Sequence, residues 1–327
     1  MSHKIGNNDR QEGLKQAWHG LTHIRESIPT DDNWLTKWDV EKLPMFNPNG
    51  TPSEFCRVTC TDDTSLYIGD PVHEETYSLI TNKQFLEMVN DCLLSVKGAK
   101  IDSIGSVCDR GRIFASVSIP QMEEFKAAGR EFRAYLNFIN SHDKSSPFVV
   151  NASNICVVCD NTFRYNLHDS KNKVFRVSVK HTKFAHNKLE DIDGMIDAYV
   201  GANARFAAIM NRLDSQPISK PDAVKFFTGL VATNVERLAT RTVNRIERIM
   251  ALHVMGRGNR GETRADAFSA ITDFYTHGVS TTDVQKQMES SEFGSGLEMK
   301  TRALDVLSDD SELTSIISRG EKILSLN

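Results

Sequence analysis

Apolar and polar residues alternate over much of the first half of the chain, which is the pattern of strands with one buried face. The alternating runs lie at residues 55–70, 99–120, 131–142, 146–159 and 174–182. Turn-forming sequences separate some of them, namely NPNGTP at 47–52 and DRGR at 109–112. Short alternating runs joined by tight turns predict an antiparallel, meandering sheet.

One amphipathic helix is predicted among these strands, at residues 81–97. Its apolar positions are 85, 88, 89, 92, 93 and 96, and Thr81 is a suitable N-cap. From about residue 186 the period becomes helical, with predicted helices at 189–213, 222–255, 265–278 and 296–307. We therefore predict an α+β fold in which the 81–97 helix packs on one face of the sheet and a helical C-terminal part follows.

Length and composition set limits on this fold. The chain has 327 residues, 39% of them apolar and 25% charged, enough for an ordinary globular core. We predict a flexible N-terminus at 1–16, a sheet domain at 17–185 and a helical region at 186–327. The apolar runs are far shorter than the roughly 20 residues of a membrane span, so no membrane contact is expected. No secretory signal is visible, which predicts a cytoplasmic location with the six cysteines as thiols.

Charge is unevenly distributed, although the net charge is only −4. Residues 160–260 contain 17 Lys and Arg against 10 Asp and Glu, whereas residues 1–159 contain 16 against 21 and residues 261–327 contain 6 against 12. A basic region between acidic flanks is what a polyanion-binding surface would show. The flanks could equally neutralise it within the molecule, and the pattern alone does not decide between the two.

The predicted helix at 222–255 concentrates part of this positive charge. At 100° per residue, Arg237, Arg241, Arg245 and Arg248 fall within an arc of about 80°, opposite an apolar face. Arg257 and Arg260 extend the strip. Glu236 or Glu247 could pair with some of these arginines, but the arginine side of the helix carries no acid. Phosphate or an acidic surface elsewhere must meet it, so these six arginines are candidate nucleic-acid ligands.

A second basic segment lies upstream. Lys180, His181 and Lys183 stand among aromatic residues near Arg164, as in grooves that bind a single strand, although a solvated loop would look the same. Asn161, Thr162 and Arg164 could offer a phosphate site, but a plain helix cap is the favoured interpretation.

Evidence for catalysis or metal binding is weak. Ser141, His142 and Asp143 are consecutive, whereas catalytic triads converge in space, so a strand end entering a polar turn is favoured. Cys156 and Cys159 with His181 and His186 would give a spacing longer than the usual zinc finger. MGRGNRGE lacks the spacing of a nucleotide-binding loop. We predict no catalytic residue, metal or cofactor, and an enzyme is not favoured.

Several segments, in order, resemble the phage/plasmid-like family of domain of unknown function 932. They are WHGL at 18–21, NWLTKWDV at 33–40, GSVCDRGRIFASVSIP at 105–120, YLNFINSHDKSSPF at 135–148, ICVVCDNTF at 155–163, KHT at 180–182 and the late segments RGNRGETRADAFSAITDFYTHG and FGSGLEMKTRAL. The resemblance implies a gene of a phage, prophage or plasmid, and it implies no established activity. The residues that match the family pattern are Asn140, Ser141, His142, Asp143, Cys159, Asn161, Thr162, His181 and Thr182, while Cys156 and Thr22 depart from it.

Three functions follow as hypotheses. The first is a nucleic-acid-binding protein of a mobile element, binding or annealing single-stranded DNA in the host cytoplasm during replication or recombination. The second is a host-takeover or anti-defence protein whose arginines meet a host protein. The third is an enzyme using His142, Asp143, Asn161 and His181. An oligomer is compatible with all three.

Overall fold

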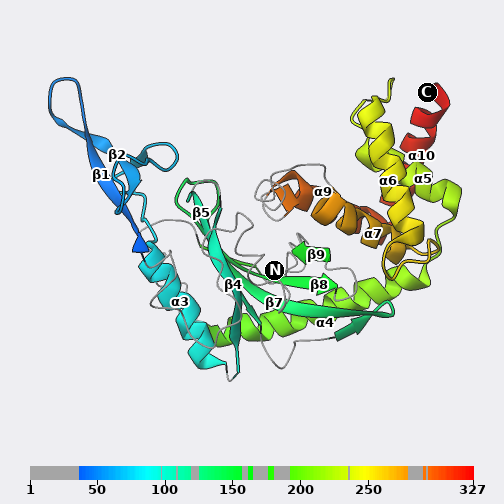
Figure 1. The fold of residues 1–327 in the computed structure, drawn as a ribbon, viewed down its shortest axis with the longest axis horizontal. Helices are drawn as coiled ribbons and strands as arrows, with labels where there is room; N and C mark the ends of the chain where they lie inside the picture. Colours follow the sequence, from blue (N-terminus) through cyan, green and yellow to red (C-terminus); the bar gives the residue numbers. More distant parts are fainter. Residues whose placement is uncertain are drawn as a thin grey trace. The chain divides into compact units, whose positions relative to one another are not determined.

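The fold is α+β, as predicted, with antiparallel sheets in the first half of the chain and helices in the second (Figure 1). The computed structural model describes residues 37–96, 98–107, 110–118, 125–156, 161–164, 176–179, 192–234, 236–278, 290–291 and 294–327. None of the helices in these ranges has the length and apolar character that crossing a bilayer requires.

The described residues form two compact units that interleave along the sequence. The first unit takes those within Met1–Glu123, Ala134–Ser153 and Asn166–Ala202, and the second takes those within Glu124–Arg133, Asn154–Tyr165 and Asn203–Asn327. The second unit thus combines two strand-forming stretches of the chain, within Glu124–Arg133 and Asn154–Tyr165, with most of the C-terminal helices.

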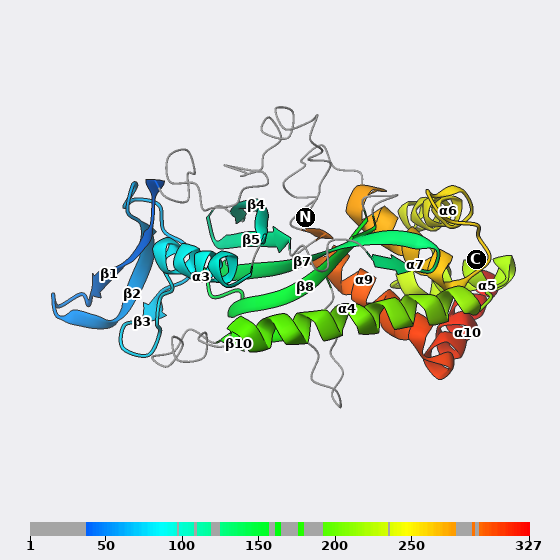
Figure 2. The ribbon, with the colours of Figure 1, turned by 90° about the horizontal axis from the view of Figure 1, so that it is seen from below.

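Two sheets are present among the described residues. The smaller has the order β1-β2-β3 and consists of β1 (Val40–Phe46), β2 (Pro52–Cys60) and β3 (Val72–His73). The larger has the order β10-β8-β7-β5-β4 (Figure 2). In addition, β6 pairs with β7 and β9 pairs with β8. Its strands are β4 (Lys100–Val107), β5 (Arg112–Ser118), β6 (Phe125–Ala127), β7 (Arg130–Ser141), β8 (Phe148–Cys156), β9 (Asn161–Arg164) and β10 (Arg176–Val179). The β4/β5, β5/β7, β6/β7 and β8/β10 pairs are antiparallel.

Residues 55–70 alternate like two strands joined at Thr61–Thr64, and this expectation was wrong for the second strand. β2 forms as expected and the turn is present, where Asp63 accepts hydrogen bonds from the backbone N–H groups of Ser65 and Leu66. After the turn the chain makes an isolated bridge between Thr59 and Tyr67 in place of a strand. The partners of β2 are β3 and β1, and the alternation did not predict β1.

Helix α3 (Asn82–Ser95) confirms the predicted helix. Thr81 and Gln84 form a reciprocal capping box at its N-terminus. Its buried side chains include Phe85, Val89 and Cys92, and the Phe85 ring meets the Phe148 ring of β8 edge to face at 6.4 Å between centroids.

Seven further named helical segments follow α3 in the part of the chain that the structure describes. They are α4 (Ile192–Ser215), α5 (Lys220–Val231), α6 (Thr240–Met255), α7 (Arg264–Asp273), the π-helical turn η3 (Phe274–Gly278), α9 (Ser295–Ser308) and α10 (Asp310–Leu326). The expected helices at 189–213, 265–278 and 296–307 are confirmed, and α10 was not predicted.

The single helix expected at 222–255 was wrong, because α5 ends at Val231 and α6 begins only at Thr240. The Arg319 guanidinium, on α10, donates to the backbone carbonyl oxygens of Gly229 and Ala232. These donors satisfy carbonyl groups at the C-terminal end of α5, where the helix leaves them without partners. Carbonyl groups at the break are thus satisfied by a residue about 90 positions away.

Helices α5 and α10 pack with their backbones in close approach. A Cβ on Gly320 would overlap the carbonyl oxygen of Lys225, and one on Gly229 would overlap that of Ile316. Glycine is required at both positions because no side chain fits between the helices.

We predict that Gly320→Ala lowers the free energy of unfolding by about 3 kcal/mol, because the added methyl must push α10 away from α5. Urea denaturation followed by circular dichroism measures this change. Ser318→Ala, at an exposed position of the same helix, should change it by less than about 0.5 kcal/mol. Equal stability of the two variants would contradict the proposed packing.

Candidate nucleic-acid interface

Helix α6 presents arginines on one side and apolar residues on the other. Ile246, Ile249 and His253 are buried, while Arg241 and Arg248 are exposed and Arg245 is half-buried. The predicted arginine face is thus present with three of its four members. Arg237 was wrongly placed on it, because it lies in the segment between α5 and α6.

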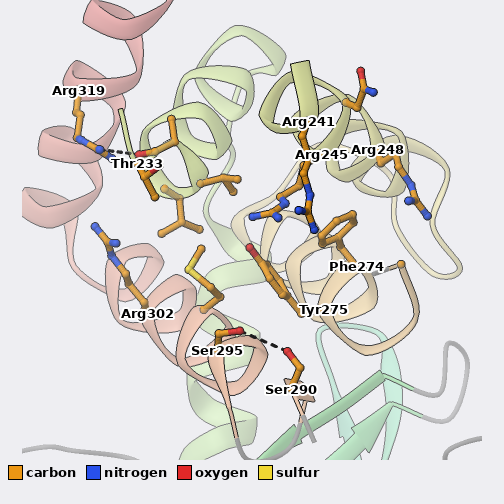
Figure 3. Close-up of a pocket in the computed structure, with 16 residues that line it drawn as sticks. Thr233, Arg241, Arg245, Arg248, Phe274, Tyr275, Ser290, Ser295, Arg302 and Arg319 are labelled. Atoms are coloured by element: carbon orange, nitrogen blue, oxygen red, sulfur yellow. Dashed lines mark hydrogen bonds between the residues drawn. The ribbon is translucent and has the colours of Figure 1, made fainter. Parts of the chain in front are cut away.

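The three α6 arginines line a cavity of about 840 Å³ that lies within the second unit (Figure 3). Arg302 of α9 and Arg319 of α10 line it as well, so five guanidinium groups border one space. The other described lining residues are Leu230, Val231, Ala232, Thr233, Asn244, Phe274, Tyr275, Gly278, Ser290, Ser295 and Met299.

No aspartate or glutamate is present among the described residues that line this cavity. The ion pairs between described residues also leave out Arg241, Arg245, Arg248 and Arg302. Arginine stays protonated at any physiological pH, so the cavity holds a concentrated positive charge. Such a site attracts anions, and planar guanidinium groups suit the oxygens of phosphate.

Two aromatic rings lie beside these arginines. The Arg248 guanidinium lies 5.6 Å from the centroid of the Phe274 ring. Burial raises the pKa of the Tyr275 hydroxyl above its ordinary value, and the nearby positive charge and hydrogen bond of Arg245 oppose this effect without cancelling it. The rings thus help to hold two arginines in position while their small exposed surface faces the cavity.

Arg319 differs from the other four in its contacts. Its guanidinium donates to the carbonyl oxygens of Gly229 and Ala232, which fixes it at the wall of the cavity (Figure 3). The role of Arg319 is therefore mainly structural. The candidate ligands of an anion are Arg241, Arg245, Arg248 and Arg302.

Other predicted basic residues do not line this cavity. Arg257 is exposed in the turn after α6, and Arg260 pairs with Asp214 at 3.0 Å, so its charge is partly neutralised. Asn161, Thr162 and Arg164 lie on β9, which corrects the favoured helix-cap interpretation. Lys180, His181, Thr182 and Lys183 lie outside the described residues.

A metal site is not visible in the part of the chain that the structure describes, where no group of three or more His, Cys, Asp or Glu side chains could hold an ion. Cys159, His181 and His186 lie outside the described residues. Cys56, Cys60 and Cys92 are buried free thiols.

Most of the chain matches the model of one protein family. A model described as Domain of unknown function (DUF932) matches residues 71–293, more than half of the chain. The chain belongs to this family. Neither a curated protein nor a solved structure matches it.

The family-pattern residues Asn140 and His142 hold the end of β7 to the start of α3 in the first unit. The His142 Nε2 atom lies 3.0 Å from Asn82 Oδ1, and the Asn82 amide donates to the Trp38 carbonyl at 3.0 Å. The Asn140 amide donates to the carbonyl of Ile80 at 3.0 Å. These side chains are fully or almost fully buried, so the contacts explain them as structural.

Ser141 and Asp143, the neighbours of His142, shape the loop after β7. Asp143 accepts a hydrogen bond from the backbone N–H of Ser145 at 2.9 Å, and the Ser141 hydroxyl accepts one from Ser146 N–H at 3.1 Å. The favoured interpretation of a strand end entering a polar turn is confirmed for these residues.

The sequence did not single out Arg302, Arg319, Phe274 or Tyr275. Arg302 and Tyr275 lie in segments that carried the family resemblance, which was the one signal available. Arg319 lies on the helix that was not predicted.

Helix α7, which leads into Phe274 and Tyr275, is anchored by a buried ion pair. Asp266 is fully buried and pairs with Arg130, which is 4% exposed. Burial alone would raise the pKa of Asp266, but hydrogen bonds from the N–H groups of Glu262 and Thr263 and the charge of Arg130 outweigh it and lower the pKa.

We predict that Asp266→Asn lowers the free energy of unfolding by about 3–5 kcal/mol at pH 7, because Arg130 is left buried without its partner. A depressed carboxyl pKa stabilises the folded state above the unfolded pKa of about 4, and this contribution is lost as pH falls through the folded pKa. The native protein should therefore lose stability below about pH 5 more steeply than the variant.

Urea denaturation between pH 7 and pH 3 measures both effects. Asp214→Asn, which removes a partner of the exposed Arg260, serves as the control and should cost less than about 1 kcal/mol. An Asp266→Asn variant as stable as this control would show that the buried pair does not anchor α7.

Proposed function

We propose that this protein binds single-stranded nucleic acid through the arginine-lined cavity and the adjoining face of α6. The observation that carries the proposal is the set of four arginines, 241, 245, 248 and 302, that border one cavity without a described carboxylate among its lining residues. Phosphate groups are the anions that most often meet such clusters in nucleic-acid-binding proteins.

The spacing of the α6 arginines supports a strand as the ligand. Arg241 and Arg248 are seven residues apart, so they span about 10 Å along the helix axis. Successive phosphates of a stacked strand rise by ~3.4 Å along the axis of the stack, so this length corresponds to about three phosphates. Exposed arginines at 241 and 248, with Arg245 between them, can follow such a backbone.

The shape of the site favours a single strand over a duplex. A cavity of about 840 Å³ would be only ~12 Å across if it were a sphere, the size of a small-molecule site. One flexible strand can place a nucleotide there beside Phe274 and Tyr275, which line the cavity, whereas a rigid duplex cannot enter.

Such a function suits the mobile-element origin that the resemblance to phage and plasmid genes implies. Binding or annealing of single strands during replication or recombination of that element would use an affinity for phosphate that is independent of sequence.

We predict that binding to an oligo-dT strand weakens as salt rises, because phosphate binding releases counterions. Each of Arg241→Gln, Arg248→Gln and Arg302→Gln should reduce the slope of log affinity against log salt by roughly 0.7. Fluorescence anisotropy over a salt series measures the slope.

Arg205→Gln is the matched control, since Arg205 is an exposed helical arginine outside the cavity and its loss should leave the slope unchanged. Absence of salt-dependent binding to any single strand would contradict the proposed function. Capture of a host protein that survives nuclease treatment would then favour an acidic protein surface as the partner of the arginines.

A further inference from the structure

The positive charge around the cavity exceeds the negative charge that the interior of a strand would bring to it. Each phosphodiester carries one negative charge, and neighbouring phosphates extend away from one another along the chain. Yet one cavity of about 840 Å³ is bordered by five arginines, namely Arg241, Arg245, Arg248, Arg302 and Arg319. This concentration is better matched by an anion that carries more than one charge on a single group.

A terminal phosphomonoester is such an anion. It carries about −1.5 to −2 charges at pH 7 and three strong acceptor oxygens, compared with one charge and two free oxygens on a phosphodiester. Three oxygens can accept hydrogen bonds from several guanidinium groups at once, and Arg binds phosphate through two parallel N–H groups.

Neutral donors add to the arginines at the same cavity. Ser295 is the first residue of α9, whose N-cap, Gly294, provides no side-chain hydrogen bond to the helix. The Ser290 and Ser295 hydroxyl oxygens lie 3.4 Å apart, and both residues line the cavity (Figure 3). Backbone N–H groups at a helix start and serine hydroxyls are common phosphate donors, and here they share a wall with Arg302 of the same helix.

We infer that the cavity receives the terminal phosphomonoester of a single strand, so that the protein binds phosphorylated strand ends in preference to strand interiors. This inference rests on the proposed function, since it assigns a particular part of the strand to the same site. Arg302, with the serines at the start of α9, holds the terminal phosphate, and the α6 arginines meet the phosphodiesters that follow it.

The test uses the full chain and four DNAs of one sequence, namely a linear strand with a 5′-phosphate, one with a 3′-phosphate, one with hydroxyls at both ends and a closed circle. We expect one phosphorylated strand to bind about tenfold more tightly than the hydroxyl-ended strand and the circle. Which phosphate confers the preference identifies the end that is bound.

Two further measurements separate a terminal-phosphate site from general charge attraction. Arg302→Gln should abolish most of the preference for the phosphorylated strand, while Arg205→Gln should preserve it. The preference should also shrink when the pH falls from 7.5 to 5.5, because the second ionisation of the phosphate has a pKa of about 6. Among the described lining residues only arginine and tyrosine are titratable, and neither ordinarily titrates in that range.

Equal affinity for all four DNAs would overturn the inference and leave the proposed function intact. A preference that Arg302→Gln does not change would place the terminal phosphate elsewhere and would also overturn it. Absence of binding to every one of the four DNAs would overturn the proposed function itself.

Discussion

The two hydrogen bonds from Arg319 to the carbonyls of Gly229 and Ala232 shape the candidate site. They satisfy the end of α5, so the chain can leave the helix there and begin α6 after eight intervening residues, at Thr240. Close packing of α10 on α5 through Gly229 and Gly320 holds Arg319 in place. Ala232 and Thr233, the first described residues of the break, line the cavity.

The charge in the cavity is the second constraint. Guanidinium groups repel one another, and gathering several of them around a cavity without carboxylates costs free energy in the unliganded protein. Such an arrangement is retained where binding an anion offsets the cost. The buried Arg130–Asp266 pair shows how the same chain treats an arginine that has a structural role, because there the charge is matched by a carboxylate and further hydrogen bonds.

The sequence predicts what local periodicity controls. Alternation located β5, β7 and β8, the Thr81 cap and apolar spacing located α3, and the helical wheel placed Arg241, Arg245 and Arg248 on one face. It could not predict contacts between distant positions. The break between α5 and α6 has no proline or glycine to mark it, and the Arg319 guanidinium that satisfies the end of α5 comes from α10. Arg302 joins the α6 arginines only after the helices pack. The buried contact of His142, a residue of the family pattern, with Asn82 also joins positions 60 residues apart.

The proposed function requires phosphate to enter the cavity that α6 and α9 line. A crystal structure of the protein with a short phosphorylated oligonucleotide tests this directly. We predict phosphate density within hydrogen-bond distance of the Arg302 guanidinium and of at least one α6 arginine. A strand bound on another surface, with the cavity occupied only by water, would contradict the proposed function of the cavity.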